Sequence, residues 1–156
     1  HAFQIATASK RIIGIGRGAE DFRTDMRMAR SEDGTEILHA RNCISLAAHA
    51  AGVMALDYVY SNFRNTDGFI ADVKFGKMLG FTCKSVIHPS QIPLVHAVYN
   101  PKEEEINQAK KIIAVYEEAL AKSSGVISLD GKMIDMPMVT RAKAILAYAK
   151  VSGKEK

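Results

Sequence analysis

Two adjacent carboxylates, Glu20 and Asp21, follow a cluster of glycines in the stretch GRGAEDFRTDM, residues 16–26. The apolar run RIIGI, typical of a buried strand, comes directly before this stretch. Carboxylates beside backbone amides that glycine leaves accessible suit a divalent cation, and Mg²⁺ prefers a few carboxylates together with water and substrate oxygens. Asp21 is therefore a candidate metal ligand, and a capping role at a helix N-terminus is the alternative.

The glycines of this region do not predict a phosphate-binding loop. Gly14, Gly16 and Gly18 alternate with single residues, whereas the dinucleotide fingerprint is GxGxxG. Two carboxylates also follow at the place where a phosphate would need amides and no anion. We exclude a nucleotide-binding loop for these two reasons.

Other titratable residues follow the expected strands and helices. Asp25 could be a second metal ligand, cap the polar segment, or pair with Arg23 or Arg27. His88 could be a base or a ligand, but a histidine at a strand end is more often a hydrogen-bonded scaffold residue. Asp135 precedes a Met-Pro pair, which is the pattern of a helix N-cap. Each of these groups thus has a structural alternative to a chemical role.

The elements that would position these groups alternate between helices and β-branched strands, which predicts an α/β fold. Parallel strands place ligand sites at their carboxyl ends, so the polar residues after each apolar run are expected to converge. Gly52 is expected to end one helix, and Thr66 or Asp67 to cap the next. In chain order the expected elements are a helix at 2–8, a strand at 11–18, a helix at 35–51, a strand at 53–63, a helix at 66–80 and a strand at 83–92.

The pattern changes after Pro101. A long amphipathic helix is expected over residues 102–125, then a short strand at 125–131. A last segment, 132–150, is expected to contain a helix that starts near Pro137 and has Asp135 close to its cap. The Asp130-Gly pair suits a tight turn without any chemical role. Because this tail repeats no earlier unit, we expect an appendage that folds over a site on this chain or on a neighbouring one.

Composition excludes several classes of protein. The chain has 156 residues, 47% of them hydrophobic and 24% charged, as in an ordinary globular domain. No apolar stretch approaches the ~20 residues of a membrane span. The net charge of +4 comes from scattered residues, with no basic stripe interleaved with aromatics. We therefore expect neither a membrane nor a nucleic acid as a partner.

The cysteines and the first residue bear on compartment and completeness. Cys43 and Cys83 lie far apart without a CxxC pattern, so we expect two buried thiols in a reducing compartment. No signal-peptide pattern is present. The chain starts at His1 in what reads as a helix already under way, and we expect it to be the C-terminal part of a larger protein.

Four blocks together resemble the citrate lyase β-subunit-like family, which includes malyl-CoA and citramalyl-CoA lyases of the 2-keto-acid aldolase superfamily. The blocks are GRGAEDF, DYVYSNFRN, GFTCKSVIHPSQI and DGKMIDMPMV with the following RAKAIL, and the resemblance runs from Ala2 to about Ala149. It implies a (β/α)₈ TIM barrel in an oligomer, usually a trimer. Residues 1–100 would be the C-terminal part of the barrel, with about three strands, and residues 101–156 a helical lid. A further metal carboxylate and a substrate-binding arginine would lie before His1.

The resemblance also implies roles for individual residues. Asp21 matches a Mg²⁺ ligand, and the backbone amides of Ala19, Glu20 and Asp21 match those that hold the carboxylate of a 2-keto acid. Asp135 matches a catalytic aspartate that reaches over the site of a neighbouring subunit and takes part in proton transfer. At Arg17, relatives tend to carry a small or apolar residue instead.

The function implied is a Mg²⁺-dependent carbon–carbon lyase. Such an enzyme cleaves a citryl, citramalyl or malyl thioester, on coenzyme A or an acyl carrier, into an acetyl or acyl thioester and a 2-keto acid. Segments 58–63 and 88–91 would lie where the thioester arm binds. The compartment would be the cytoplasm, or the mitochondrial matrix in a eukaryote. The alternative is a non-catalytic member of the same fold that binds a thioester or a keto acid.

Overall fold

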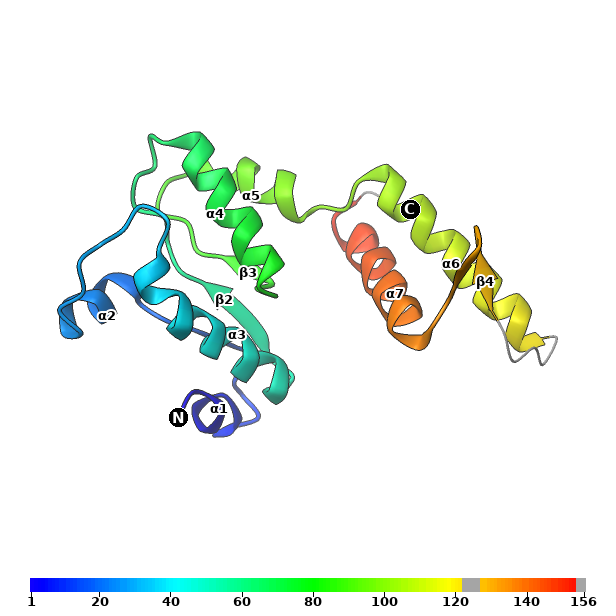
Figure 1. Ribbon diagram of the computed structural model, residues 1–156, viewed down its shortest axis with the longest axis horizontal. Helices are drawn as coiled ribbons and strands as arrows, with labels where there is room; N and C mark the ends of the chain where they lie inside the picture. Colours follow the sequence, from blue (N-terminus) through cyan, green and yellow to red (C-terminus); the bar gives the residue numbers. More distant parts are fainter. Residues whose placement is uncertain (122–126, 154–156) are drawn as a thin grey trace. The chain divides into compact units, whose positions relative to one another are not determined.

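A small parallel β-sheet organises the first part of the chain (Figure 1). The computed structural model describes residues 1–121 and 127–153, and the chain divides into two units, residues 1–98 and 99–156. The strands of the first unit are β1 (Gly14–Gly16), β2 (Met54–Asp57) and β3 (Cys83–Lys84). Its helices are α1 (Ala2–Thr7), α2 (Ala19–Asp25), α3 (Leu38–Ala51), α4 (Thr66–Met78) and α5 (Gln91–Tyr99), with the short 3-10 helix η1 (Thr35–Ile37) before α3.

The strands lie in the order β1-β2-β3 and run parallel, which confirms the α/β class. Ile15 pairs with Ala55 across β1 and β2, and Asp57 pairs with Lys84 across β2 and β3. Because the strands are parallel, their carboxyl ends meet at one edge of the sheet. The segments after β1, β2 and β3 therefore leave from the same edge, as the sequence predicts.

A compact apolar core joins the sheet to α1 and α3. Its members are small or β-branched side chains with one phenylalanine, and each is at most 8% exposed. Small residues such as alanine allow the helices to approach the strands closely. The core residues are Ala6, Ile15, Ala48, Ala55 and Phe81.

Local signals set the ends of the two long helices. Gly52 has φ 68°, a left-handed conformation that glycine adopts without strain, and it ends α3 as predicted. The cap of α4 is Asn65, whose side-chain Oδ1 accepts a hydrogen bond from the Gly68 N–H at 3.0 Å. The prediction of Thr66 or Asp67 as that cap is wrong by one or two residues.

One helix of this unit was not predicted, and two sequence expectations are wrong. The acidic segment after Gly18, for which the sequence predicts neither helix nor strand, forms α2, because acids in a first turn complement the positive helix terminus. The strand expected at 83–92 ends at Lys84, and its second half leads into α5. Cys43 is exposed and Cys83 is half-buried, and both are free thiols.

The second unit is a helical hairpin with a small β-ribbon, formed by α6 (Glu103–Ala121), β4 (Ser128–Leu129), β5 (Lys132–Met133) and α7 (Met136–Val151). Asp130 and Gly131, at φ 51° and 75°, make the tight turn between β4 and β5, which confirms the turn prediction. The sequence did not predict β5, because two residues between a turn and a helix cap are too few to show an alternating pattern. The helices pack through a buried cluster of Ala109, Ile112, Ile134, Val139 and Ala142.

Parts of two expectations, the end of the helix at 102–125 and the start of the strand at 125–131, lie outside the described residues. Within the described residues, no helix combines the length and the apolar character that crossing a membrane requires.

Candidate active site

The first turn of α2 lies at the carboxyl end of β1 and carries the candidate metal ligand. Gly18 is the N-cap residue, and the first hydrogen bond of the helix runs from the Phe22 N–H to the Gly18 carbonyl at 3.2 Å. The N–H groups of Ala19, Glu20 and Asp21 precede that bond, so they have no partner within the helix. A Cβ on Gly18 would come within 2.9 Å of Asp21 Oδ2. Glycine at position 18 thus leaves room for the Asp21 carboxylate beside the start of the helix.

Glu20 and Asp21 have different surroundings although they are neighbours. Both Glu20 oxygens accept hydrogen bonds: Oε1 from Arg23 Nη1 at 2.8 Å, and both oxygens from Arg30 Nη1 at 2.9 Å. Asp21 is exposed, and its carboxylate has no hydrogen-bond or ion-pair partner among residues 1–121 and 127–153. Of the two carboxylates, only Asp21 is therefore available to a cation.

The described part of the chain does not hold a complete metal site. None of its side chains form a group of three His, Cys, Asp or Glu able to bind an ion. Asp25 is exposed at the end of α2, and Arg23 pairs with Glu20 and Glu36 instead. Asp21 fits Mg²⁺ as one oxygen ligand, and Mg²⁺ characteristically takes its remaining ligands from water and substrate.

A buried network of four charged side chains ties the ends of β2 and β3 to α3 and α4. Arg41 makes a bidentate contact with Asp57, from Nε to Oδ1 at 3.0 Å and from Nη2 to Oδ2 at 2.5 Å. Lys84 Nζ contacts Asp57 Oδ2 at 2.9 Å and also Asp72 Oδ2. Arg41 Nη1 reaches Asp72 Oδ1 at 3.0 Å. Two cations and two anions thus neutralise one another, and Lys84 is not a free amine.

Tyr58, directly after β2, covers this network. Its ring lies 4.6 Å from both the Arg41 guanidinium and the Lys84 ammonium. Burial, reinforced by the Asp72 carboxylate, raises the pKa of Tyr58 to about 12. Helix α4 packs closely against the same network. A Cβ on Gly76 of this helix would lie 2.5 Å from Asp57 Oδ2, so the close approach of α4 to Asp57 requires glycine at position 76.

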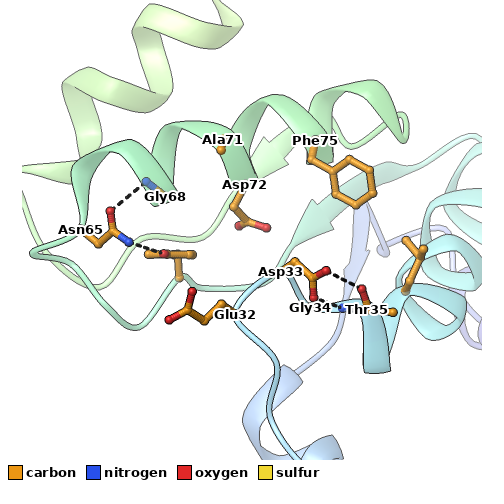
Figure 2. A pocket seen from close by; sticks show the side chains of 11 residues that line it. Glu32, Asp33, Gly34, Thr35, Asn65, Gly68, Ala71, Asp72 and Phe75 are labelled. Atoms are coloured by element: carbon orange, nitrogen blue, oxygen red, sulfur yellow. Dashed lines mark hydrogen bonds between the residues drawn. The ribbon is translucent and has the colours of Figure 1, made fainter.

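A groove of about 450 Å³ opens between α4 and the segment before α3 (Figure 2). Figure 2 shows Asp72 and Phe75 on α4 on one side and Glu32 and Asp33 on the facing segment. Both oxygens of the Asp33 carboxylate already accept hydrogen bonds, from the Thr35 N–H at 3.1 Å and from Thr35 Oγ1 at 2.8 Å. The groove is acidic at its rim and carries small and aromatic side chains on the α4 side.

A hydrogen bond and a ring stack join the segment after β2 to the segment after β3. Gln91 is 1% exposed, and its Nε2 donates a hydrogen bond to the Tyr60 carbonyl at 3.1 Å. The His88 ring stacks on Phe63 with centroids 4.8 Å apart, and its Nδ1 lies 2.8 Å from Ser90 Oγ. His88 is thus a hydrogen-bonded and stacked side chain, as the scaffold interpretation expects, and its role as base or ligand stays a prediction.

Asp135, the candidate catalytic residue, belongs to the second unit. Its side chain accepts a hydrogen bond from the Met138 N–H at 2.9 Å and caps α7, which confirms the N-cap prediction. The residue is exposed. A chemical role for it stays a prediction.

Sequence reasoning missed the buried charges. Arg41, Asp57 and Lys84 are separated by 16 and 27 positions, so no local motif links them. The same holds for Arg17, whose three guanidinium nitrogens are buried without a hydrogen-bond partner among the described residues. The guanidinium stacks over Phe22 at 4.2 Å, and burial, together with nearby Arg23, lowers the pKa of Arg17. The sequence marked Arg17 only as a departure from the family pattern, at a position where relatives tend to carry a small or apolar residue.

Comparison with known proteins gives consistent results. The model of the family described as HpcH/HpaI aldolase/citrate lyase matches residues 1–89. The citrate lyase subunit beta of Leuconostoc mesenteroides subsp. cremoris is 48% identical over 149 residues, which cover 96% of this chain and 49% of that protein. The mitochondrial citramalyl-CoA lyase of Rattus norvegicus is 39% identical over 139 residues, which cover 89% of this chain and 41% of that protein.

A solved structure is similar over nearly the whole chain. Protein CitE of Mycobacterium tuberculosis, crystallised with magnesium, acetoacetate and coenzyme A, superposes with a TM-score of 0.77 at 32% identity. The match covers 96% of this chain and 56% of CitE. The chain spans half or less of the length of the two curated relatives named above.

Proposed function

The chain belongs to the HpcH/HpaI aldolase/citrate lyase family, as its sequence blocks indicated, and from this membership we propose that it forms part of a Mg²⁺-dependent carbon–carbon lyase. The substrate is a β-hydroxyacyl thioester of the citryl, citramalyl or malyl type, carried by coenzyme A or an acyl carrier. The products are an acetyl or acyl thioester and a 2-keto acid. The observation that carries the proposal is the difference between Glu20 and Asp21. Arg23 and Arg30 donate hydrogen bonds to the Glu20 carboxylate, whereas the Asp21 carboxylate is available to a cation.

The architecture proposed with it is the C-terminal part of a (β/α)₈ barrel, in which β1, β2 and β3 are the last three strands. The second unit would be a lid, and the assembly a homotrimer in which the lid reaches a neighbouring subunit. The two free cysteines support a reducing compartment, the cytoplasm or the mitochondrial matrix.

In the proposed site, Asp21 would hold the Mg²⁺, and the N–H groups of Ala19, Glu20 and Asp21 would hold the carboxylate of the keto acid. Mg²⁺ bound there would lower the pKa of the substrate alcohol and would stabilise negative charge on its oxygen. The residues of the α2 turn fix the orientation of the keto-acid half. In cleavage the alcohol gives its proton to solvent water, the carbon–carbon bond breaks, and its electron pair leaves a thioester enolate beside the new keto group.

Asp135 supplies the proton that the enolate carbon takes up. A carboxylic acid suits this role when a closed, dry site adjusts its pKa. Placement on a lid means that closure completes the site. The segments after β2 and β3, fastened through Gln91 and the Tyr60 carbonyl, offer a fixed surface for the thioester arm.

The test is turnover by the full-length protein on citryl, citramalyl and malyl thioesters, each presented on coenzyme A and on an acyl carrier. Release of a 2-keto acid is followed as its phenylhydrazone. We expect cleavage of at least one substrate, loss of activity with EDTA and recovery with Mg²⁺. Metal-independent turnover, or no turnover on the whole panel, would refute the proposal.

A non-catalytic member of the family is the second candidate. It is favoured by the single available carboxylate of the α2 turn, because the described residues form no group of three His, Cys, Asp or Glu around it. Such a protein would bind a 2-keto acid or a thioester in calorimetry and release no product over hours.

A further inference from the structure

Arg30 links two segments that the proposed function uses for different halves of the substrate. Its Nη1 donates to both oxygens of Glu20 at 2.9 Å, and its Nη2 donates to Ser61 Oγ at 2.5 Å. Glu20 lies in the first turn of α2, next to Asp21. Ser61 lies in the segment that follows β2. One guanidinium therefore connects the candidate metal turn with the candidate thioester segment.

The Glu20 end of this link is fixed from a second direction. Arg23 is 6% exposed and donates from Nη1 to Glu20 Oε1 at 2.8 Å. The Arg23 Nε contacts Glu36 Oε1 at 2.5 Å, and Ser31 Oγ donates to the other Glu36 oxygen. Glu20 is thus tied to the buried part of the first unit through Arg23, and among the residues that the structure describes Arg30 alone extends the contacts to Ser61.

The chemistry of the link requires arginine. A guanidinium has a planar fork of donors, so Nη1 and Nη2 bind two partners in a fixed geometry. An ammonium group in the same place is a single point charge and holds the carboxylate or the hydroxyl, with no fixed relation between them. The fork thereby makes the position of the α2 turn depend on the position of the segment after β2.

We propose that Arg30 is a positioning residue that couples the Mg²⁺-binding turn to the thioester-binding segment. It touches neither the ion nor the thioester and acts through Glu20 on one side and Ser61 on the other. The inference rests on the proposed function, since it assigns Mg²⁺ to the turn and the thioester to the segment.

The experiment measures two quantities on the full-length protein: the Mg²⁺ dissociation constant by calorimetry and the KM for the thioester. In Arg30→Met we expect both to rise about fivefold to tenfold, which is the loss of a charge-assisted hydrogen bond. In Ser61→Ala we expect the KM alone to rise. In Arg30→Lys the pairing with Glu20 persists, so the Mg²⁺ constant stays within about twofold of wild type while the KM rises as in Ser61→Ala.

The sign of the Mg²⁺ effect separates positioning from simple electrostatics. Removing a positive charge near a bound cation strengthens its binding if charge alone matters. Arg11→Met removes the same charge from an exposed position on the segment before β1 and serves as the matched control. We expect Arg30→Met to weaken Mg²⁺ binding, and Arg11→Met to change neither quantity.

Two results would overturn the inference while leaving the proposed function intact. The first is a wild-type Mg²⁺ constant in Arg30→Met, or tighter binding. The second concerns the double variant of Arg30→Met and Ser61→Ala. Residues that act through one shared contact have non-additive effects, so a double-variant KM raised by the full product of the two single factors would show that Arg30 and Ser61 act independently. If the wild-type protein binds no Mg²⁺, the proposed function itself fails.

Circular dichroism melting identifies a misfolded variant. Arg30 is about half exposed, so its replacement by methionine should disturb the fold little.

Discussion

Glu20 and Asp21 are adjacent in sequence and differ in what surrounds their carboxylates. The i,i+3 spacing from Glu20 to Arg23 brings those two charges together on one face of α2, and Arg30 closes over them. Asp21 lies on another face of the turn, beside Gly18. Sequence alone could identify the two acids as a candidate site but could not separate them, because Arg30 is ten residues away and its direction depends on the fold.

Arg17 is the residue whose replacement is expected to stabilise the protein. A buried donor without a partner costs about 1–3 kcal/mol and Arg17 has three such nitrogens, whereas a single desolvated stack on Phe22 returns about 2 kcal/mol. We expect Arg17→Leu to raise the free energy of unfolding by about 1 kcal/mol, measured by urea denaturation. Arg11→Leu, at an exposed position, is the control and should have no effect. A less stable Arg17→Leu protein would mean that the guanidinium has a partner in solution.

Glu36 gives a pH prediction. Although burial opposes its ionisation, hydrogen bonds from Ser31 and Arg23 lower the pKa of Glu36 from 4.5 to about 2. A folded-state pKa below the unfolded one stabilises the protein above the unfolded value, and this contribution is lost as pH falls through the folded value. We expect wild type to melt at a higher temperature than Glu36→Gln at neutral pH. The difference should shrink between pH 4.5 and about 2, and a constant difference down to pH 2 would contradict the assignment.

At the scale of elements, periodicity and glycines predicted the long helices well. The 3.6-residue pattern located α3, α4, α6 and α7 to within a few residues, and Gly52 ended α3 where expected. Among the short elements, α2, α5 and β5 were missed. The start of α2 has glycines and acids that read as a loop, and α5 follows an apolar run that favours a strand. In these places the packing of the chain, not the local pattern, decides the structure.

Helix α4 provides the test at this scale. A Cβ on Gly76 would lie 2.5 Å from Asp57 Oδ2 and 3.0 Å from Arg41 Nη2. Displacing this buried pair costs about 1–3 kcal/mol, more than the helix propensity that alanine adds, about 1 kcal/mol. We expect Gly76→Ala to lower the free energy of unfolding by about 1–2 kcal/mol in denaturant titration. Lys74→Ala, an exposed position of the same helix, should change it by less than about 0.5 kcal/mol.

At the scale of the whole molecule, the two candidate chemical residues belong to different units, Asp21 to residues 1–98 and Asp135 to residues 99–156. Family resemblance supplied the role of Asp135, since its own surroundings predict only a helix cap. The buried network around Asp57 lies within the first unit and ties the ends of β2 and β3 to α3 and α4.

The division into units predicts separable defects. Asp135→Asn in the full-length protein should lower kcat at least about a hundredfold, the scale of a lost general acid, and leave the Mg²⁺ dissociation constant within about twofold. Asparagine also caps helices, so α7 should persist in circular dichroism. Retained turnover would remove Asp135 from the mechanism.

The most direct test of the central claim is a calorimetric Mg²⁺ titration of the full-length wild-type protein, Asp21→Asn and Asp25→Asn. Loss of groups that merely support a metal ligand costs about 10–100-fold in affinity, so loss of the ligand itself should cost more. The account predicts a Mg²⁺ dissociation constant more than about 100-fold higher in Asp21→Asn and unchanged in Asp25→Asn. Wild-type Mg²⁺ affinity in Asp21→Asn, or a loss confined to Asp25→Asn, would contradict it.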